Sequence, residues 1–177
     1  MAKHIFVING SGGVGKSTFC NIIRDYSGHD TYIISSVDDI KKKATSMGWD
    51  GISKSEKDRK FLSDLKDLCT WYNDAPYEYI KREIKYFNAS IKKEIMFIHI
   101  REPKEIERIK QDFGAEAILI TNKNVSHITS NNADKGVFDY YYDYVIKNNG
   151  TLGDLKNTAL DFIGRFYEER SVYEVYH

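Results

Sequence analysis

The stretch that decides the fold of this chain is HIFVINGSGGVGKS, residues 4–17. Residues 4–9 are apolar and rich in β-branched side chains, which predicts a buried strand. Residues 10–17 match the pattern G-x-x-x-x-G-K-S/T at every fixed position. Residues 18–24 then place apolar side chains at helical spacing. A strand, a glycine-rich loop and a helix in this order predict a phosphate-binding loop in a parallel α/β protein.

The residue types in this loop suit a polyphosphate. Backbone N–H groups can surround the phosphates only where side chains stay out of the way, and the glycines meet that need. Lys16 is expected to reach the β- and γ-phosphates and act in catalysis, and the Ser17 hydroxyl is expected to ligate Mg²⁺. We therefore expect ATP and Mg²⁺ as cofactors. The residues predicted to contact the nucleotide here are Gly10, Gly12, Gly13, Val14, Gly15, Lys16, Ser17 and Thr18.

Composition narrows the class of protein. The 177 residues carry 29% charged side chains with a formal net charge of zero, so no nucleic-acid partner is expected. No apolar run approaches the ~20 residues that cross a bilayer, and the first predicted strand starts too early for a secretion signal. Cys20 and Cys69 form no metal-binding spacing and predict a reducing, cytoplasmic location.

Five apolar segments alternate with helical patterns along the chain. They predict an α/β fold with three layers, α/β/α, around a five-stranded parallel sheet. One domain, 1–177, is expected, with a helical acceptor-binding insert at about 37–90 and a short polar lid at about 121–136. The strands are predicted at residues 4–9, 31–35, 94–100, 117–120 and 144–146.

Two charged residues follow predicted strands, at the edge where open α/β sheets bind ligands. Asp38 follows the second strand, and Arg101 follows the third. Asp39 is expected instead to form a helix cap together with Ser36. Arg101 could also be a structural ion-pair residue. Arg59, early in the helix predicted from residue 55, either belongs to a solvated face or binds an acceptor phosphate with its bidentate fork.

Two other classes of nucleotide-binding protein fit less well. A regulatory GTPase would carry D-x-x-G after its third strand and N-K-x-D for guanine. Here the third strand ends in Arg101-Glu102-Pro103, and Asn122-Lys123-Asn124-Val125 lacks the final aspartate. A large ATPase needs an acidic strand end, and only the second strand ends so, at Asp38.

The order of these motifs resembles the nucleoside monophosphate kinase-like P-loop kinases, closest to the deoxynucleoside monophosphate kinase and dephospho-CoA kinase branch. The resemblance rests on the P-loop and on three further segments: Ser36-Val37-Asp38-Asp39-Ile40, Arg101-Glu102-Pro103 and Asn148-Asn149-Gly150-Thr151-Leu152. In dephospho-CoA kinases an Asp-Ala-Asp stretch follows the second strand. Val37-Asp38 takes its last two places, and Ser36 replaces the first aspartate.

The resemblance implies roles for individual residues. Asp38 would contact the acceptor or serve as base, and Arg59 resembles an arginine that binds the acceptor phosphate. Arg101 is expected to contribute to acceptor binding and catalysis because of its place at the strand end, not because of the resemblance. The turn containing Asn149 and Gly150 is where family members hold the adenine, largely through backbone groups.

One departure from the family affects the expected activity. Family lids present arginines to the transferred phosphoryl group, whereas residues 121–136 contain none, only Lys123 and Lys135. Either Lys123 or an arginine elsewhere, Arg101 or Arg108, supplies the charge, or catalysis is weak.

Two functions therefore stay open. The first is ATP-dependent phosphoryl transfer to a small phosphorylated acceptor, a (deoxy)nucleoside monophosphate, by a monomer or homodimer. The second is an ATP-binding P-loop regulator or interaction protein with little turnover. No membrane partner is expected for either.

Overall fold

The computed structural model describes residues 3–125, 137–138 and 140–174. The chain divides into two compact units, one formed by residues 1–33 and 92–177 and the other by residues 34–91. The elements are β1 (His4–Asn9), α1 (Lys16–Tyr26), β2 (Thr31–Ser35), α2 (Asp38–Ser46), α3 (Glu56–Asn73), α4 (Ala75–Ala89), β3 (Ile95–His99), α5 (Pro103–Phe113), β4 (Glu116–Thr121), β5 (Tyr144–Lys147) and α7 (Leu152–Glu174).

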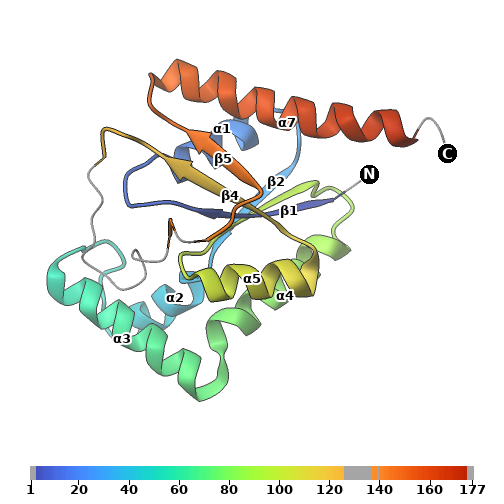
Figure 1. Cartoon of the computed structure of the whole chain (residues 1–177). Coiled ribbons are helices and arrows are strands. Elements are labelled where there is room, and N and C mark those ends of the chain that lie inside the picture. The colour runs from blue at the N-terminus through green and yellow to red at the C-terminus, as the bar shows by residue number, and fades with distance from the viewer. Residues whose placement is uncertain (1–2, 126–136, 139, 175–177) are drawn as a thin grey trace. The chain divides into compact units, whose positions relative to one another are not determined.

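The sheet has five parallel strands in the order β2-β3-β1-β4-β5, which confirms the predicted fold class (Figure 1). β1 lies at its centre. In the register, Phe6 pairs with Phe97 of β3, and Ile8 pairs with Ile118 of β4. The carboxyl ends of β1, β3 and β4 therefore lie next to one another, and the glycine-rich loop begins where β1 ends.

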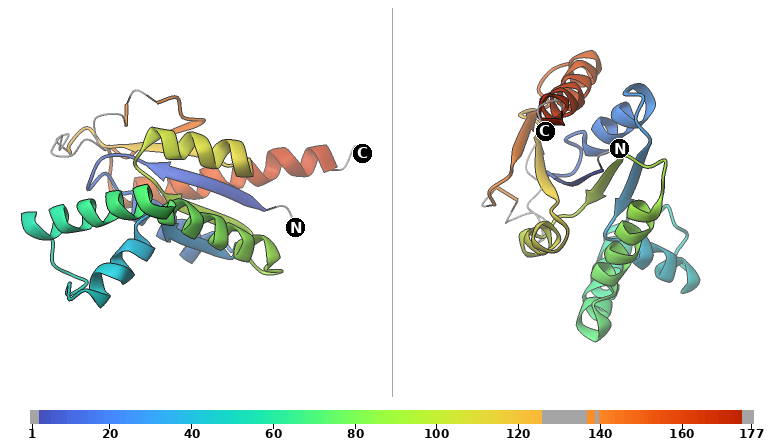
Figure 2. Two further views of the ribbon diagram at one scale, coloured as in Figure 1. Left: turned by 90° about the horizontal axis from the view of Figure 1, so that it is seen from below. Right: turned by 90° about the vertical axis from the view of Figure 1, so that its right-hand side faces the viewer.

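Alternate residues of the strands bury opposite faces of the sheet, as expected for parallel strands with helices on both sides. α1 and α7 cover one face and pack on each other, while α5 covers the other (Figure 2). Aromatic rings fill the first face. Phe6 stacks on Phe97 with ring centroids 5.5 Å apart, and Phe162 of α7 meets Phe6 edge-on at 5.5 Å. Cys20 is fully buried there, and burial raises the pKa of its thiol, so it serves as an apolar core residue.

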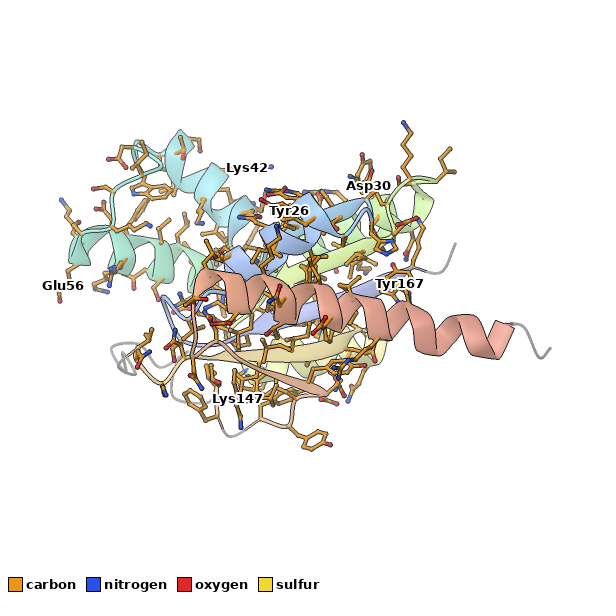
Figure 3. All side chains as sticks on the ribbon, turned by 90° about the horizontal axis from the view of Figure 1, so that it is seen from above. Tyr26, Asp30, Lys42, Glu56, Lys147 and Tyr167 are labelled. Carbon is orange, nitrogen blue, oxygen red and sulfur yellow. The ribbon has the colours of Figure 1, made fainter. Side chains whose placement is uncertain are left out.

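Side-chain contacts hold the last helix, α7, at its start and again further along. Thr151 and Asp154 form a capping pair: the Asp154 N–H donates to Thr151 Oγ1 at 3.2 Å, and the Thr151 N–H donates to Asp154 Oδ2 at 2.7 Å. Further along, Tyr167 stacks on His29 with centroids 4.1 Å apart, and the Lys156 ammonium lies 3.4 Å from the centre of the Tyr26 ring (Figure 3 labels Tyr26 and Tyr167).

The second unit consists mainly of helices α2, α3 and α4. Ser55 and Asp58 form a complete capping box at the start of α3. Asp74, in the left-handed region with φ 54°, ends α3 and begins α4. Pro76 lies in the first turn of α4, where proline is tolerated. α3 buries no residue fully, and Trp71 on it is 80% exposed.

The predicted cap by Ser36 and Asp39 is wrong. α2 begins at Asp38, one residue later than a cap at Ser36 would place it, and the Ser35 N–H donates to Asp38 Oδ2 at 2.7 Å. Asp39 instead forms an ion pair with Lys43 one turn later. The sequence offers two adjacent aspartates, and only the backbone path shows which of them reaches back to the strand.

Asp143 links the start of β5 to two other elements. Its Oδ2 accepts from the Ala117 N–H of β4 at 2.6 Å and from the Lys110 ammonium of α5 at 2.7 Å. Burial works against ionisation of Asp143, but these two partners outweigh it and lower the pKa of the carboxyl below its ordinary value.

We expect Asp143→Asn to lower the free energy of unfolding by about 1 kcal/mol at pH 7, a small value because the carboxyl is partly exposed. A lowered pKa in the folded state means that the stabilisation is complete above the unfolded value of about 4 and is lost as pH falls through the folded value. Urea unfolding at pH 7 and at about pH 2.5 measures the difference between the two proteins, which should vanish at the acidic pH. A difference of equal size at both pH values would contradict this account.

Candidate nucleotide-binding site

Three of the four predicted glycines adopt conformations that other residues avoid. Gly10, Gly13 and Gly15 have φ values of 140°, 82° and 101°. Gly12 does not, so its need for glycine is not conformational. A Cβ on Gly12 would meet no atom within 4 Å, which leaves space above its backbone.

The loop lies close against neighbouring groups at two points, a backbone carbonyl and a side-chain amide. A Cβ on Gly10 would stand 2.3 Å from the carbonyl oxygen of Ile120 in β4. A Cβ on Gly15 would stand 2.5 Å from Nδ2 of Asn148, which itself donates to the Val14 carbonyl at 2.9 Å. Glycine at 10 and 15 is therefore required both by the backbone conformation and by the lack of room.

The loop leads directly into the N-terminus of α1. Gly15 precedes the helix in a left-handed conformation, and no side chain caps the helix. Its first N–H groups and the positive end of its dipole can therefore serve an anion. Ser17 and Thr18 are exposed at this end, as a metal ligand and a phosphate contact must be.

Lys16 folds back over the loop. Its ammonium donates to the carbonyls of Gly10 and Ser11 at 2.6 and 2.7 Å. The lysine is therefore held by the same loop that is expected to receive the phosphates, at the side of the loop nearest β1.

Sequence reasoning missed Asn9, the residue before the first glycine. Asn9 is fully buried, and its Oδ1 accepts from the Gly10 N–H at 2.7 Å. Its Nδ2 donates to the Arg101 carbonyl at 3.1 Å and to the Tyr142 hydroxyl at 2.8 Å. The available signal was a polar residue at the end of an otherwise apolar strand. Its partners could not be identified from the sequence, because they are 92 and 133 positions away. The backbone of Arg101 therefore lies beside the loop, because its carbonyl accepts from Asn9.

The turn expected to hold the adenine also adjoins the loop. Asn148 donates to Val14, and its own N–H donates to the Thr121 carbonyl at 2.8 Å. The Lys123 N–H donates to Asn149 Oδ1 at 2.9 Å. Gly150 has no room for a Cβ, which would lie 2.4 Å from Asp154 Oδ2. The structure thus brings residues 121–123 and 148–150 together beside the phosphate loop, while the adenine contact itself stays a prediction.

The other predicted acceptor residues, Asp38 and Arg59, belong to the second unit. Asp38 begins α2 with one carboxylate oxygen on the Ser35 N–H. Arg59 lies in the first turn and a half of α3 and is exposed. The convergence of these two side chains on the phosphate loop stays a prediction, as does the helical insert at 37–90. Most of the predicted lid, residues 126–136, lies outside the described residues.

The described part of the chain holds no cluster of three or more His, Cys, Asp or Glu side chains arranged for a metal ion. Over the same residues, none of the helices is long and apolar enough to cross a bilayer.

Comparison with known proteins places the fold but not a family. No protein-family model matches the sequence, and no curated protein matches it significantly. Solved structures do match. Thymidylate kinase from Candida albicans has a TM-score of 0.54 at 12% identity, over 94% of this chain and 93% of that one. A gluconokinase from Sinorhizobium meliloti 1021 has a TM-score of 0.50 at 15% identity, over 98% of both chains.

A third match is shikimate kinase from Acinetobacter baumannii, solved with shikimate. Its TM-score is 0.50 at 11% identity, over 94% of each chain. These three structures are kinases of different small molecules. At such identities they establish that this chain has the fold of P-loop small-molecule kinases, and they do not identify the acceptor.

Alanine at two glycines should separate conformation from ligand space. We expect Gly10→Ala to lower the free energy of unfolding by more than about 2 kcal/mol, because of its φ and the Ile120 carbonyl. Gly12→Ala should change it by less than about 0.5 kcal/mol, yet weaken ATP binding because a methyl group would enter the space left for phosphate. Urea unfolding and titration with a fluorescent ATP analogue measure the two effects. Equal stability of the two variants would contradict the described loop.

Proposed function

We propose that the protein is a kinase that transfers the γ-phosphoryl group of ATP to a small phosphorylated acceptor, a (deoxy)nucleoside monophosphate. The observation that carries the proposal is the glycine loop. Three glycines with positive φ lead into a helix N-terminus that no side chain caps, and Lys16 folds over the loop. This arrangement is suited to a polyphosphate and lies at the carboxyl edge of a parallel sheet, where such folds bind their ligands.

The nucleotide side of the reaction is assigned to the first unit. The N–H groups of the loop and of the start of α1 bind the phosphates, and Lys16, kept in place by the Gly10 carbonyl, donates to the phosphate oxygens. The turn at Asn149 and Gly150 holds the adenine. Charge that develops on the transferred group in the transition state is met by Lys16 and by Arg101.

Magnesium fits this donor set. The described residues provide the exposed Ser17 hydroxyl rather than a carboxylate cage, and Mg²⁺ is commonly held by one or two protein oxygens together with the phosphates and water. Ser17 would hold the ion, which would neutralise phosphate charge.

The acceptor side is assigned to Asp38 and Arg59, with Arg101. Arg59 would bind the acceptor's phosphate through its bidentate fork. A phosphate acceptor is already ionised and needs no base, so Asp38 would then orient the acceptor. An acceptor hydroxyl would instead use Asp38 as a general base.

An ATP-binding regulator with little turnover is the second candidate. The feature that favours it is the absence of arginine from residues 121–136 in the sequence. Such a protein would bind ATP tightly and hydrolyse or transfer it slowly whatever the acceptor.

An acceptor screen distinguishes the two. Purified protein with ATP and Mg²⁺ is assayed for ADP release against a panel of ribo- and deoxynucleoside monophosphates, dephospho-CoA, gluconate and shikimate. Release that depends on one nucleoside monophosphate supports the proposal. Release stimulated by gluconate or shikimate alone would overturn the assigned acceptor class, and tight ATP binding without stimulation would favour the regulator.

Lys16→Ala should lower kcat by about 10²–10³-fold, the loss typical of removing one group that stabilises transition-state charge. Lys85→Ala is the matched control, because Lys85 is an exposed lysine of α4 and should leave kcat unchanged. Steady-state rates with the acceptor from the screen measure both. A Lys16→Ala enzyme with wild-type kcat would contradict the assignment.

Arg59→Ala should raise KM for the acceptor about tenfold or more while KM for ATP stays the same, because only the acceptor phosphate loses a charged partner. Lys60→Ala is the control: Lys60 is the next residue and pairs with Asp64 on the surface at 2.8 Å. If the two variants behave alike, the solvated-face interpretation of Arg59 is correct.

A further inference from the structure

The side-chain amide of Asn9 is buried and fully hydrogen-bonded beside the phosphate loop. Its Oδ1 accepts from the Gly10 N–H, and its Nδ2 donates to the Arg101 carbonyl and the Tyr142 hydroxyl, at distances of 2.7, 3.1 and 2.8 Å. A neutral amide has two N–H donors and one carbonyl oxygen, so the three contacts use both donors and the acceptor.

The contacts also determine the orientation of the amide. Rotating it by 180° would set Nδ2 against the Gly10 N–H, donor against donor, and Oδ1 against the Arg101 carbonyl, acceptor against acceptor. Only one orientation satisfies all of the buried partners, and an unsatisfied buried group is costly. Asn9 is therefore held in a single state.

These contacts reach the charged group of the site through one residue. Gly10 gives its N–H to Asn9 and its carbonyl to the Lys16 ammonium at 2.6 Å. Gly10 is also confined by Ile120, whose carbonyl leaves no space for a Cβ. A shift at Asn9 would therefore move the Gly10 turn and the carbonyl that holds Lys16.

Tyr142 is the side-chain partner of Asn9, and its hydroxyl accepts from Asn9 Nδ2. It is 7% exposed and lies just before β5, where Asp143 is tied to β4 by the Ala117 N–H. The Tyr142 ring is thus anchored in the first unit independently of the loop, and its hydroxyl gives Asn9 a fixed partner.

We propose that Asn9 and Tyr142 are positioning residues that hold the Gly10 turn, and through it Lys16, in the geometry needed for phosphoryl transfer. Neither side chain touches substrate. The kinetic part of this inference rests on the proposed kinase function, whereas its effect on the loop does not.

Tyr142→Phe is the variant that tests it, because phenylalanine keeps the buried ring and removes only the hydroxyl. Tyr140→Phe is the matched control: Tyr140 packs edge-on against Tyr142 at 5.1 Å, and its hydroxyl donates to Glu107 at 2.7 Å. The control removes a tyrosine hydroxyl from the same segment, one that is hydrogen-bonded to Glu107 rather than to Asn9.

The first readout is amide hydrogen exchange of the peptide covering residues 10–17, with and without ATP and Mg²⁺. Tyr142→Phe should speed exchange of this peptide about fivefold or more relative to wild type and to Tyr140→Phe, because the turn loses a fixed partner. Exchange within twofold of wild type would overturn the inference.

The second readout is the split between kcat and KM. We expect kcat to fall about tenfold with KM for ATP changed less than about twofold, because several N–H groups still bind the triphosphate while the transition state needs Lys16 in place. A raised KM for ATP with unchanged kcat would overturn the positioning role. The two parts of the inference can fail separately. If the wild-type protein turns over no acceptor but loop exchange is faster in Tyr142→Phe, then Asn9 and Tyr142 hold the Gly10 turn and the kinase proposal is wrong.

A pH profile separates positioning from proton transfer. Burial raises the pKa of Tyr142 to about 12, although the hydrogen bond from Asn9 acts in the opposite direction. The phenol therefore keeps its proton between about pH 6.5 and about pH 9, and the ratio of wild-type to Tyr142→Phe kcat should be constant across that range. A ratio that changes there would show that the hydroxyl exchanges a proton in the reaction and would overturn the role proposed.

Discussion

The close approach of Gly10 to the Ile120 carbonyl is the constraint on which the site depends. A chain leaving the central strand must turn sharply there, between β3 on one side and β4 on the other. Only a residue without a Cβ fits the turn and its φ of 140°. The strands therefore determine the direction in which the loop leaves the sheet.

The rigidity of this edge comes from burial on both faces of the sheet. Phe6, Val7 and Ile8 of β1 are all inaccessible to solvent, so β1 cannot slide without disturbing both layers of the core. Asn9 is the last residue of this rigid strand, and its hydrogen bonds hold the start of the loop in place. Lys16, at the other end of the loop, is held by carbonyls whose positions the strand end determines.

The proposed chemistry divides between the two units. The phosphate loop, the strand end at Arg101 and the turn at residues 148–150 belong to the first unit, and Asp38 and Arg59 belong to the second. Under the proposal, the first unit holds the nucleotide and contributes Arg101 to acceptor binding, and the second unit contributes Asp38 and Arg59.

Local sequence determined much of this molecule. The β-branched runs and the glycine loop are short-range patterns, and each one appears where it was expected, because each depends on residues within a few positions. The path of the backbone decided which of two adjacent aspartates accepts from Ser35 at the start of α2, and it decided that Gly12 needs no unusual φ. The partners of Asn9 depended on the packing of three strand ends, since Arg101 and Tyr142 are distant in sequence and meet Asn9 only when the sheet assembles in its particular order.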